Sequence, residues 1–130
     1  MKSILFVCIE NACRSQMAEA IAKNIFKNIE VNSAGLNISK KINPNTIKVM
    51  NEIGIDMKGQ YPKILTKELV EKADLIVTMG CIKQCPLTPK QKTINWNLED
   101  PSGKDLDFFR KTRDKIFQLL HELKGKYNIE

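Results

Sequence analysis

The residues best suited to chemistry lie between Cys8 and Ser15, where a cysteine opens a short segment and Arg14 nearly closes it. The apolar run at residues 4–7 predicts a buried strand before this segment, and residues 16–22 predict a helix after it. A loop between a strand and a helix start directs backbone N–H groups toward one point, where they can bind an anion. This positive potential also favours the thiolate, the nucleophilic form of cysteine, and a guanidinium matches two oxygens of a tetrahedral oxyanion. The segment therefore predicts covalent catalysis on a phosphate-like anion, with Cys8 as the nucleophile.

The predicted oxyanion-binding groups belong to Ile9, Glu10, Asn11, Ala12, Cys13, Arg14 and Ser15. The alternative without a catalytic function is a buried structural cysteine and a surface arginine that have this spacing by chance. The flanking strand and helix favour catalysis, since Ser15 can hydrogen-bond a thiolate and Asn11 can brace the loop. Cys13 has two interpretations, as a buried residue or as a partner that caps an oxidised Cys8.

Asp100 and the pair Cys81 and Cys85 are further candidates for catalysis. An Asp-Pro pair usually marks only a turn, but a carboxyl group at the site could protonate a leaving group. The cysteine pair could be half of a zinc site, a redox pair or two small apolar residues in a turn. The other two cysteines have the wrong spacing to complete a zinc site, and the only histidine, His121, is expected at the surface. A redox pair fits better, because a second thiolate can attack an intermediate on Cys8 and carry the oxidation away.

The 130 residues predict one domain, residues 1–130, with one hydrophobic core. The formal charge of +6 favours anionic partners, but scattered lysines without interleaved aromatic residues do not indicate nucleic acid binding. The N-terminal apolar run is too short for a signal peptide, and no apolar stretch approaches the ~20 residues of a membrane span. We therefore expect a cytoplasmic protein without membrane association. In that compartment, cysteines are more often catalytic or metal-binding than disulfide-bonded.

Short apolar runs alternate with helical patterns along the chain, which is typical of an α/β fold with a parallel sheet. The expected strands are residues 3–7, 30–34, 75–79 and 93–96, and the expected helices are residues 15–27, 43–53, 66–72 and 106–124. In the second helix, Ile47, Met50 and Ile53 are expected to face the core. Gly125 is expected to end the last helix.

Three loops with reactive side chains follow these strands, at Cys8, Cys81 and Asp100. Binding sites of parallel sheets lie beyond the carboxyl ends of the strands. The three loops are therefore expected to converge on one edge of the sheet, where they would form a single site.

The residues that carry a family resemblance are 7–19, 33–35, 74–79 and 100–101. Together they resemble the low-molecular-weight tyrosine phosphatase fold over nearly the whole chain. Within that fold, residues 14–19 and 100–104 are more similar to the thioredoxin-coupled arsenate reductases. The resemblance implies a single domain with a four-stranded parallel sheet of order 2-1-3-4, flanked by helices on both faces. We also expect a monomer that needs no cofactor.

The resemblance further implies a cascade of thiol steps. Cys8 attacks arsenate, which Arg14 and the loop N–H groups hold, while Asp100 assists the departure of hydroxide. Cys81 then attacks Cys8 and releases arsenite. Cys85 attacks Cys81, and thioredoxin or another thiol reductant reduces the resulting disulfide.

The alternative function is a phosphatase that hydrolyses phosphomonoesters through a phosphocysteine at Cys8. Residues 102–103 are Ser-Gly where the phosphatases usually have an aromatic residue, and Cys81 and Cys85 have counterparts in the reductases. Both features favour the reductase. The spacing of the cysteine pair is shorter than in the best-known reductases, so a small thiol could replace Cys85 or thioredoxin.

A monovalent cation binds in some relatives of this type near the positions of Asn11, Glu19 and Ser33. Lys63 falls where those relatives have an additional carboxylate. A lysine ammonium could substitute for the cation, so we predict that the protein requires no metal.

Overall fold

The computed structural model describes residues 1–80 and 88–129. Its elements are β1 (Ser3–Cys8), α1 (Arg14–Ile25), β2 (Glu30–Gly35), α2 (Pro44–Glu52), α3 (Lys67–Lys72), β3 (Leu75–Thr78), the 3-10 turn η1 (Lys90–Lys92), β4 (Thr93–Asn95) and α4 (Leu106–Lys126). The strands form one parallel sheet in the order β2-β1-β3-β4. The predicted fold class and strand order are confirmed.

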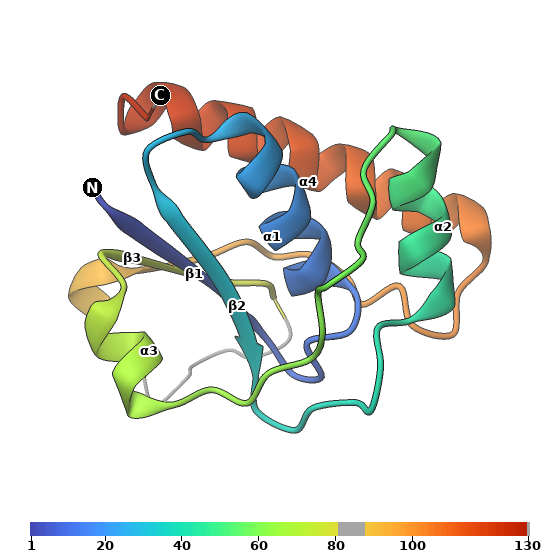
Figure 1. Cartoon of the computed structure of the whole chain (residues 1–130), viewed down its shortest axis with the longest axis horizontal. Coiled ribbons are helices and arrows are strands. Elements are labelled where there is room, and N and C mark those ends of the chain that lie inside the picture. Colours follow the sequence, from blue (N-terminus) through green and yellow to red (C-terminus); the bar gives the residue numbers. More distant parts are fainter. Residues whose placement is uncertain (81–87, 130) are drawn as a thin grey trace.

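The sheet is covered by helices on both faces, with α1, α2 and α4 on one side and α3 on the other (Figure 1). Strand β1 is buried along its whole length, as its continuous apolar sequence predicts for a central parallel strand. Because side chains alternate along a strand, Ile4, Phe6 and Cys8 contribute to the larger core, whereas Leu5 and Val7 contribute to the smaller one. Cys8 therefore begins the catalytic segment from a rigid, fully enclosed strand.

The core face of α2 differs from the prediction. Met50 is buried as expected, but Ile47 and Ile53 are 38% and 40% exposed, and Thr46 and Val49 lie in the interior instead. The buried set keeps helical spacing but begins with a threonine, which an apolar pattern does not count. Ile53 lies beyond the last helical residue, so it does not belong to the helix face.

The end of α4 also differs from the prediction, since the helix passes through Gly125 and ends at Lys126. Asn128 has a left-handed backbone, with φ of 52°, and the Ile129 N–H donates to the Lys124 carbonyl at 3.0 Å. Asparagine tolerates this conformation better than most residues, so it supplies the turn that was expected of glycine.

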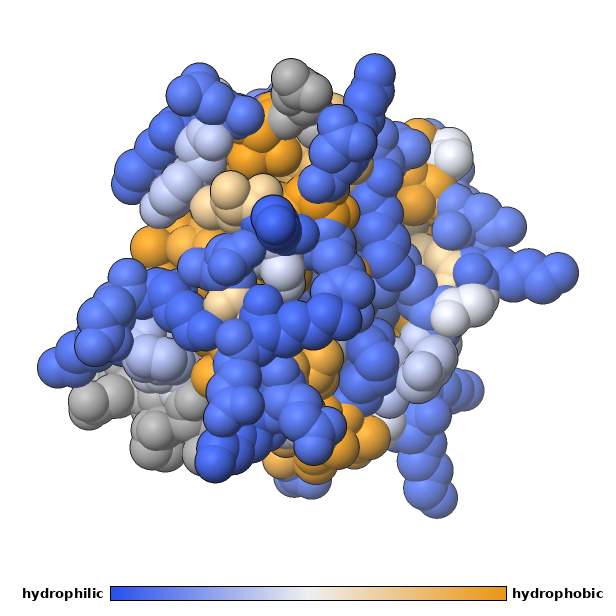
Figure 2. All heavy atoms as spheres, turned by 60° about the vertical axis from the view of Figure 1, so that its left-hand side comes forward, coloured by the Kyte–Doolittle hydropathy of each residue, from blue (hydrophilic) through white to orange (hydrophobic). Residues whose placement is uncertain are grey.

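Hydrophilic side chains cover most of the face in Figure 2, and apolar residues are visible between them in smaller patches. No helix within residues 1–80 and 88–129 is long and apolar enough to cross a membrane. Trp96 is buried and packs on Phe6, with ring centroids 6.0 Å apart, so it serves the core next to the carboxyl end of the sheet.

Candidate active site

Residues 9–13 form a loop between β1 and α1, here called the anion loop. Backbone N–H groups of the segment 37–43 donate to the loop carbonyls of Ile9, Glu10 and Ala12, at 2.9, 3.1 and 3.1 Å. Among the described residues, the N–H groups of Ile9, Glu10, Ala12 and Cys13 have no acceptor. The loop is therefore held through its carbonyl groups, and it leaves several N–H groups available to an anion.

The Cys8 side chain lies beside the anion loop, and only 3% of the residue is exposed. The Asn11 backbone N–H donates to Cys8 Sγ at 3.2 Å, and Ser15 Oγ lies 2.7 Å from the same sulfur. Asn11 Nδ2 donates to Ser15 Oγ at 2.7 Å, which leaves the hydroxyl hydrogen of Ser15 for the sulfur. Two donors directed at one sulfur stabilise a thiolate, as a nucleophilic cysteine requires.

Gly35, at the end of β2, allows the anion loop to lie against the sheet. A Cβ atom on Gly35 would stand 2.6 Å from the Ile9 carbonyl oxygen and 2.9 Å from the Asn11 nitrogen. Both atoms belong to the backbone and cannot rotate away. Asn11 itself has a φ of 53°, so the loop combines a left-handed residue with a close approach that only glycine permits.

Arg14 is 3% exposed and is held by the loops at the carboxyl end of the sheet. Its Nη1 donates to the Met79 and Leu98 carbonyl oxygens, both at 2.9 Å. Its Nε is buried and has no partner among the described residues. Because a buried guanidinium N–H without an acceptor is costly, this atom is evidence for an anion between Arg14 and the loop.

Asp100 lies at the mouth of the site, with its side chain 52% exposed. Its Oδ2 is 3.7 Å from Arg14 Nη2, and its Oδ1 accepts a hydrogen bond from the Ser102 N–H at 3.0 Å. With Cys8 and Arg14 it lines a small pocket over the anion loop. The structure thus brings together three of the predicted catalytic residues, and the carboxylate is accessible for proton transfer with solvent.

The other two predicted catalytic residues, Cys81 and Cys85, lie outside the described residues. The residue before them, Gly80, lines an outer cleft together with Ile9, Arg14 and Asp100. Gly80 has a φ of 87°, and a Cβ atom there would stand 2.4 Å from the Leu98 nitrogen. Glycine is required at this position, since the segment that holds Arg14 passes directly over it.

Cys13 is a buried thiol at the start of α1. Burial raises its pKa to about 12, because a thiolate there would lose its hydration. Of the two interpretations from the sequence, burial is confirmed. At neutral pH Cys13 is an uncharged thiol and therefore a poor nucleophile.

Glu19 is a buried carboxylate in α1 that is paired with two lysines. Lys23 Nζ lies 2.6 Å and Lys63 Nζ 3.3 Å from its oxygens, and Ser33 Oγ donates to it at 2.5 Å. Burial alone would raise the pKa of Glu19, but hydrogen bonds from Lys23 and Ser33 and the charge of Lys63 outweigh it and lower the pKa. The Lys63 ammonium lies at the carboxylate where the sequence suggested that it replaces a cation. The described residues contain no cluster of three metal-ligating side chains.

The lowered pKa of Glu19 predicts a pH-dependent contribution to stability. We expect Glu19→Gln to lower the free energy of unfolding by about 2 kcal/mol at neutral pH, where the carboxylate is charged. A carboxyl group with a lowered folded-state pKa stabilises the fold above its unfolded-state pKa, and this contribution is lost as the pH falls through the folded-state value. Urea unfolding of both proteins should therefore show a difference that shrinks below pH ~4.5.

The matched control for Glu19→Gln is Glu71→Gln, which removes a carboxylate from an exposed pair with Lys67. It should change the free energy of unfolding by less than about 0.5 kcal/mol. A Glu19→Gln difference that persists unchanged into acid would show that the ion pairs are not its cause.

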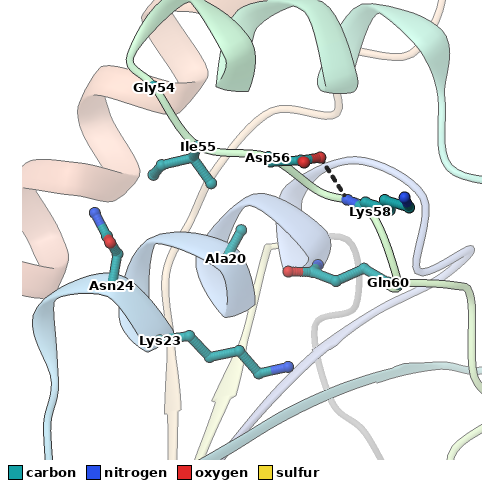
Figure 3. Close-up of a pocket in the computed structure, with 9 residues that line it drawn as sticks. Ala20, Lys23, Asn24, Gly54, Ile55, Asp56, Lys58 and Gln60 are labelled. Atoms are coloured by element: carbon teal, nitrogen blue, oxygen red, sulfur yellow. Dashed lines mark hydrogen bonds between the residues drawn. The ribbon is translucent and has the colours of Figure 1, made fainter.

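A second pocket lies between α1 and the segment 54–60 (Figure 3). It is lined by Ala20, Lys23, Asn24, Gly54, Ile55, Asp56, Lys58, Gly59 and Gln60. None of these side chains is a cysteine or another nucleophile of the predicted kind. The chemistry therefore belongs to the anion loop, although this pocket is close to it through Gln60.

Gln16 is a polar residue beside the anion loop that was not among the site residues predicted from the sequence. It is completely buried in α1 and donates to Asn11 in the anion loop. The available signal was a glutamine directly beside the apolar stripe of a predicted helix, which carries little information by itself.

Comparisons with known proteins agree with this geometry. The family described as low molecular weight phosphotyrosine protein phosphatase matches residues 3–129. An arsenate reductase of Brevibacillus brevis is 40% identical over 119 residues, which cover 88% of each chain. A solved arsenate reductase in the phosphate binding state is 35% identical with a TM-score of 0.85, over 97% of this chain and 98% of that one. A tyrosine phosphatase of Erwinia amylovora is 26% identical with a TM-score of 0.87, over 96% and 92% of the two chains.

Proposed function

Because this chain belongs to the low molecular weight phosphotyrosine protein phosphatase family, we propose that it uses the anion loop to reduce arsenate to arsenite. The observation that carries the proposal is the 40% identity to an arsenate reductase over 119 residues. The donors around Cys8 and the unpartnered Nε of Arg14 support an anion in this loop.

The first step of the proposed reaction is attack of the Cys8 thiolate on the arsenic of bound arsenate. A sulfur–arsenic bond forms and an arsenic–oxygen bond breaks, and Asp100 gives a proton to the departing hydroxide, which leaves as water. Arg14 and the loop N–H groups hold the remaining oxygens and their negative charge. Arsenic remains pentavalent in this adduct.

The second step is the reduction, and we assign it to Cys81. Its thiolate attacks the Cys8 sulfur, a disulfide forms, and the electron pair of the sulfur–arsenic bond stays on arsenic. Arsenite leaves with trivalent arsenic, so two thiols are oxidised while one arsenate is reduced. Cys85 then attacks Cys81, which frees Cys8 and leaves a Cys81–Cys85 disulfide.

The Cys81–Cys85 disulfide needs an external reductant before the next cycle. We propose thioredoxin or another thiol compound in this role, and a monomeric protein that acts in the cytoplasm. A reducing compartment fits this scheme, because it supplies thiols and keeps the resting cysteines reduced.

Hydrolysis of phosphomonoesters is the second candidate function, and the family description and the tyrosine phosphatase neighbour favour it. Cys8, Arg14 and Asp100 would serve both reactions. Arsenate and phosphate esters present similar tetrahedral oxyanions, so a slow phosphatase activity is expected beside the reductase activity.

The test is arsenite release in a single turnover without added thiol, followed for the wild type, Cys8→Ser and Cys81→Ser. The wild type should release about one arsenite per protein, and both variants should release none. Cys81→Ser should still hydrolyse an aryl phosphate at the wild-type rate, whereas Cys8→Ser should not, since only Cys8 forms the covalent adduct. Full arsenite release by Cys81→Ser would overturn the cascade, and a wild type that only hydrolyses the ester would favour the phosphatase.

A further inference from the structure

Gln16 uses every polar atom of its buried side chain. Its Nε2 donates to the Asn11 carbonyl oxygen at 3.1 Å, to Asn11 Oδ1 at 3.0 Å and to the Tyr61 carbonyl oxygen at 3.0 Å. Its Oε1 accepts a hydrogen bond from Gln60 Nε2 at 2.7 Å. The residue is 0% exposed. A buried amide is costly unless its hydrogen bonds are made, so this arrangement has a fixed orientation.

Backbone groups determine the direction of these hydrogen bonds. The Asn11 and Tyr61 carbonyl oxygens can only accept, so the Gln16 amide must present its NH2 group to them. The Gln16 carbonyl oxygen lies 3.3 Å from Gln60 Nε2, which orients the Gln60 amide in the same way. Figure 3 shows Gln60 extending from its segment toward α1.

The same logic fixes the side chain of Asn11. Its Oδ1 lies between two groups that can only donate, Gln16 Nε2 and the Lys63 backbone N–H at 2.8 Å. Its Nδ2 is therefore turned toward Ser15 Oγ at 2.7 Å and Ser33 Oγ at 3.0 Å. Ser15 Oγ accepts from Asn11, and its own hydrogen remains for Cys8.

We propose that Gln16 is a positioning residue for the reaction proposed above: it fixes the Asn11 amide so that Ser15 donates to the Cys8 thiolate. The hydrogen bonds form a one-way series of donors from Gln60 through Gln16, Asn11 and Ser15 to Cys8. Without the Gln16 donor, only the Lys63 N–H still holds Asn11 Oδ1, so the Asn11 amide rotates more readily and offers its oxygen to Ser15. Ser15 then donates to Asn11, and the thiolate loses one of its two described donors.

The test follows alkylation of Cys8 by iodoacetamide across pH in a Cys81→Ser, Cys85→Ser background. Cys13 reacts poorly there, because its raised pKa keeps it an uncharged thiol. Gln16→Met removes the donor with little change in shape, and Gln16→Glu replaces it with an acceptor. Both variants should react about tenfold more slowly at neutral pH, with the rate profile moved to higher pH, because a hydrogen bond to a charged sulfur is lost. Gln118→Glu makes the same chemical change on an exposed face of α4 and should leave the profile unchanged.

Folded Gln16 variants with the wild-type pH profile would overturn the proposal. If thermal unfolding shows that neither variant folds, Gln60→Glu is measured instead. This change replaces the donor to Gln16 Oε1 with an acceptor, at a half-buried position. A shifted profile then supports the series of donors, and an unchanged profile overturns it. The measurement needs no arsenate, so a wild type that releases no arsenite would defeat the proposed function alone.

Discussion

Arg14→Lys should lower kcat/KM for arsenate and for an aryl phosphate by a factor of about 10²–10³. Lysine keeps the positive charge but has one ammonium in place of a planar group with five N–H donors. Arg14 Nη1 donates to the Met79 and Leu98 carbonyl oxygens, while Nε remains available to an anion. A lysine that donates to both carbonyl oxygens has one N–H donor left and cannot also bind two oxygens of an oxyanion. The inhibition constant of inorganic phosphate should rise with the loss of activity.

Arg113→Lys is the matched control, because Arg113 is also buried and also donates to a carbonyl oxygen, that of Val49 at 2.8 Å. It lies between α2 and α4, outside the anion loop. This variant should lose stability in thermal unfolding but keep kcat/KM within about twofold of the wild type. Arg14→Lys with more than about a third of the wild-type activity would show that the guanidinium geometry is unimportant.

Gly35→Ala should lower turnover about a hundredfold and the free energy of unfolding by about 1–3 kcal/mol. The added methyl group meets the Ile9 carbonyl oxygen and the Asn11 nitrogen at less than 3 Å, so the anion loop must move away from the sheet. The Asn11 N–H then no longer reaches Cys8 Sγ, and the loop N–H groups no longer point toward one bound anion. Steady-state hydrolysis of an aryl phosphate and urea unfolding measure the two effects.

Gly125→Ala is the control for the glycine change, since a Cβ atom at Gly125 meets nothing within 4 Å. Gly125 lies inside α4, where alanine favours the helix by about 0.5–1 kcal/mol, so this variant should be more stable and fully active. If Gly35→Ala retained wild-type turnover, the contact between β2 and the anion loop would not position the catalytic groups.

Local sequence patterns predicted the parts of the site that one continuous segment builds. The buried strand, the loop and the helix start around Cys8 are adjacent in sequence, so their chemistry could be derived without knowing the rest of the fold. Alternating strands and helices also predicted the parallel sheet and the convergence of Asp100 on Arg14. These inferences succeed because they depend on spacing and on the general geometry of parallel sheets.

Features that depend on pairs of distant residues could not be predicted in this way. The inward face of α2 was misjudged because Thr46 is buried by its neighbours and not by its own hydrophobicity. The role of Gln16 could not be predicted, because its partners come from the anion loop and from residues 60–61, which are far apart in sequence. Likewise, only the structure reveals that Gly35 faces the loop that begins at Cys8.

Three carbonyl groups of the anion loop accept hydrogen bonds from segment 37–43, and this support from the fold has a consequence for selectivity in the proposed reaction. A rigid cradle of N–H groups fits any tetrahedral oxyanion of similar size, so phosphate should be a constant competitor for arsenate. Arsenate is then distinguished from phosphate after the covalent adduct has formed. Arsenic can take the electron pair of its bond to sulfur, whereas a phosphocysteine can only be hydrolysed. The substrate would be sorted by the fate of its covalent adduct.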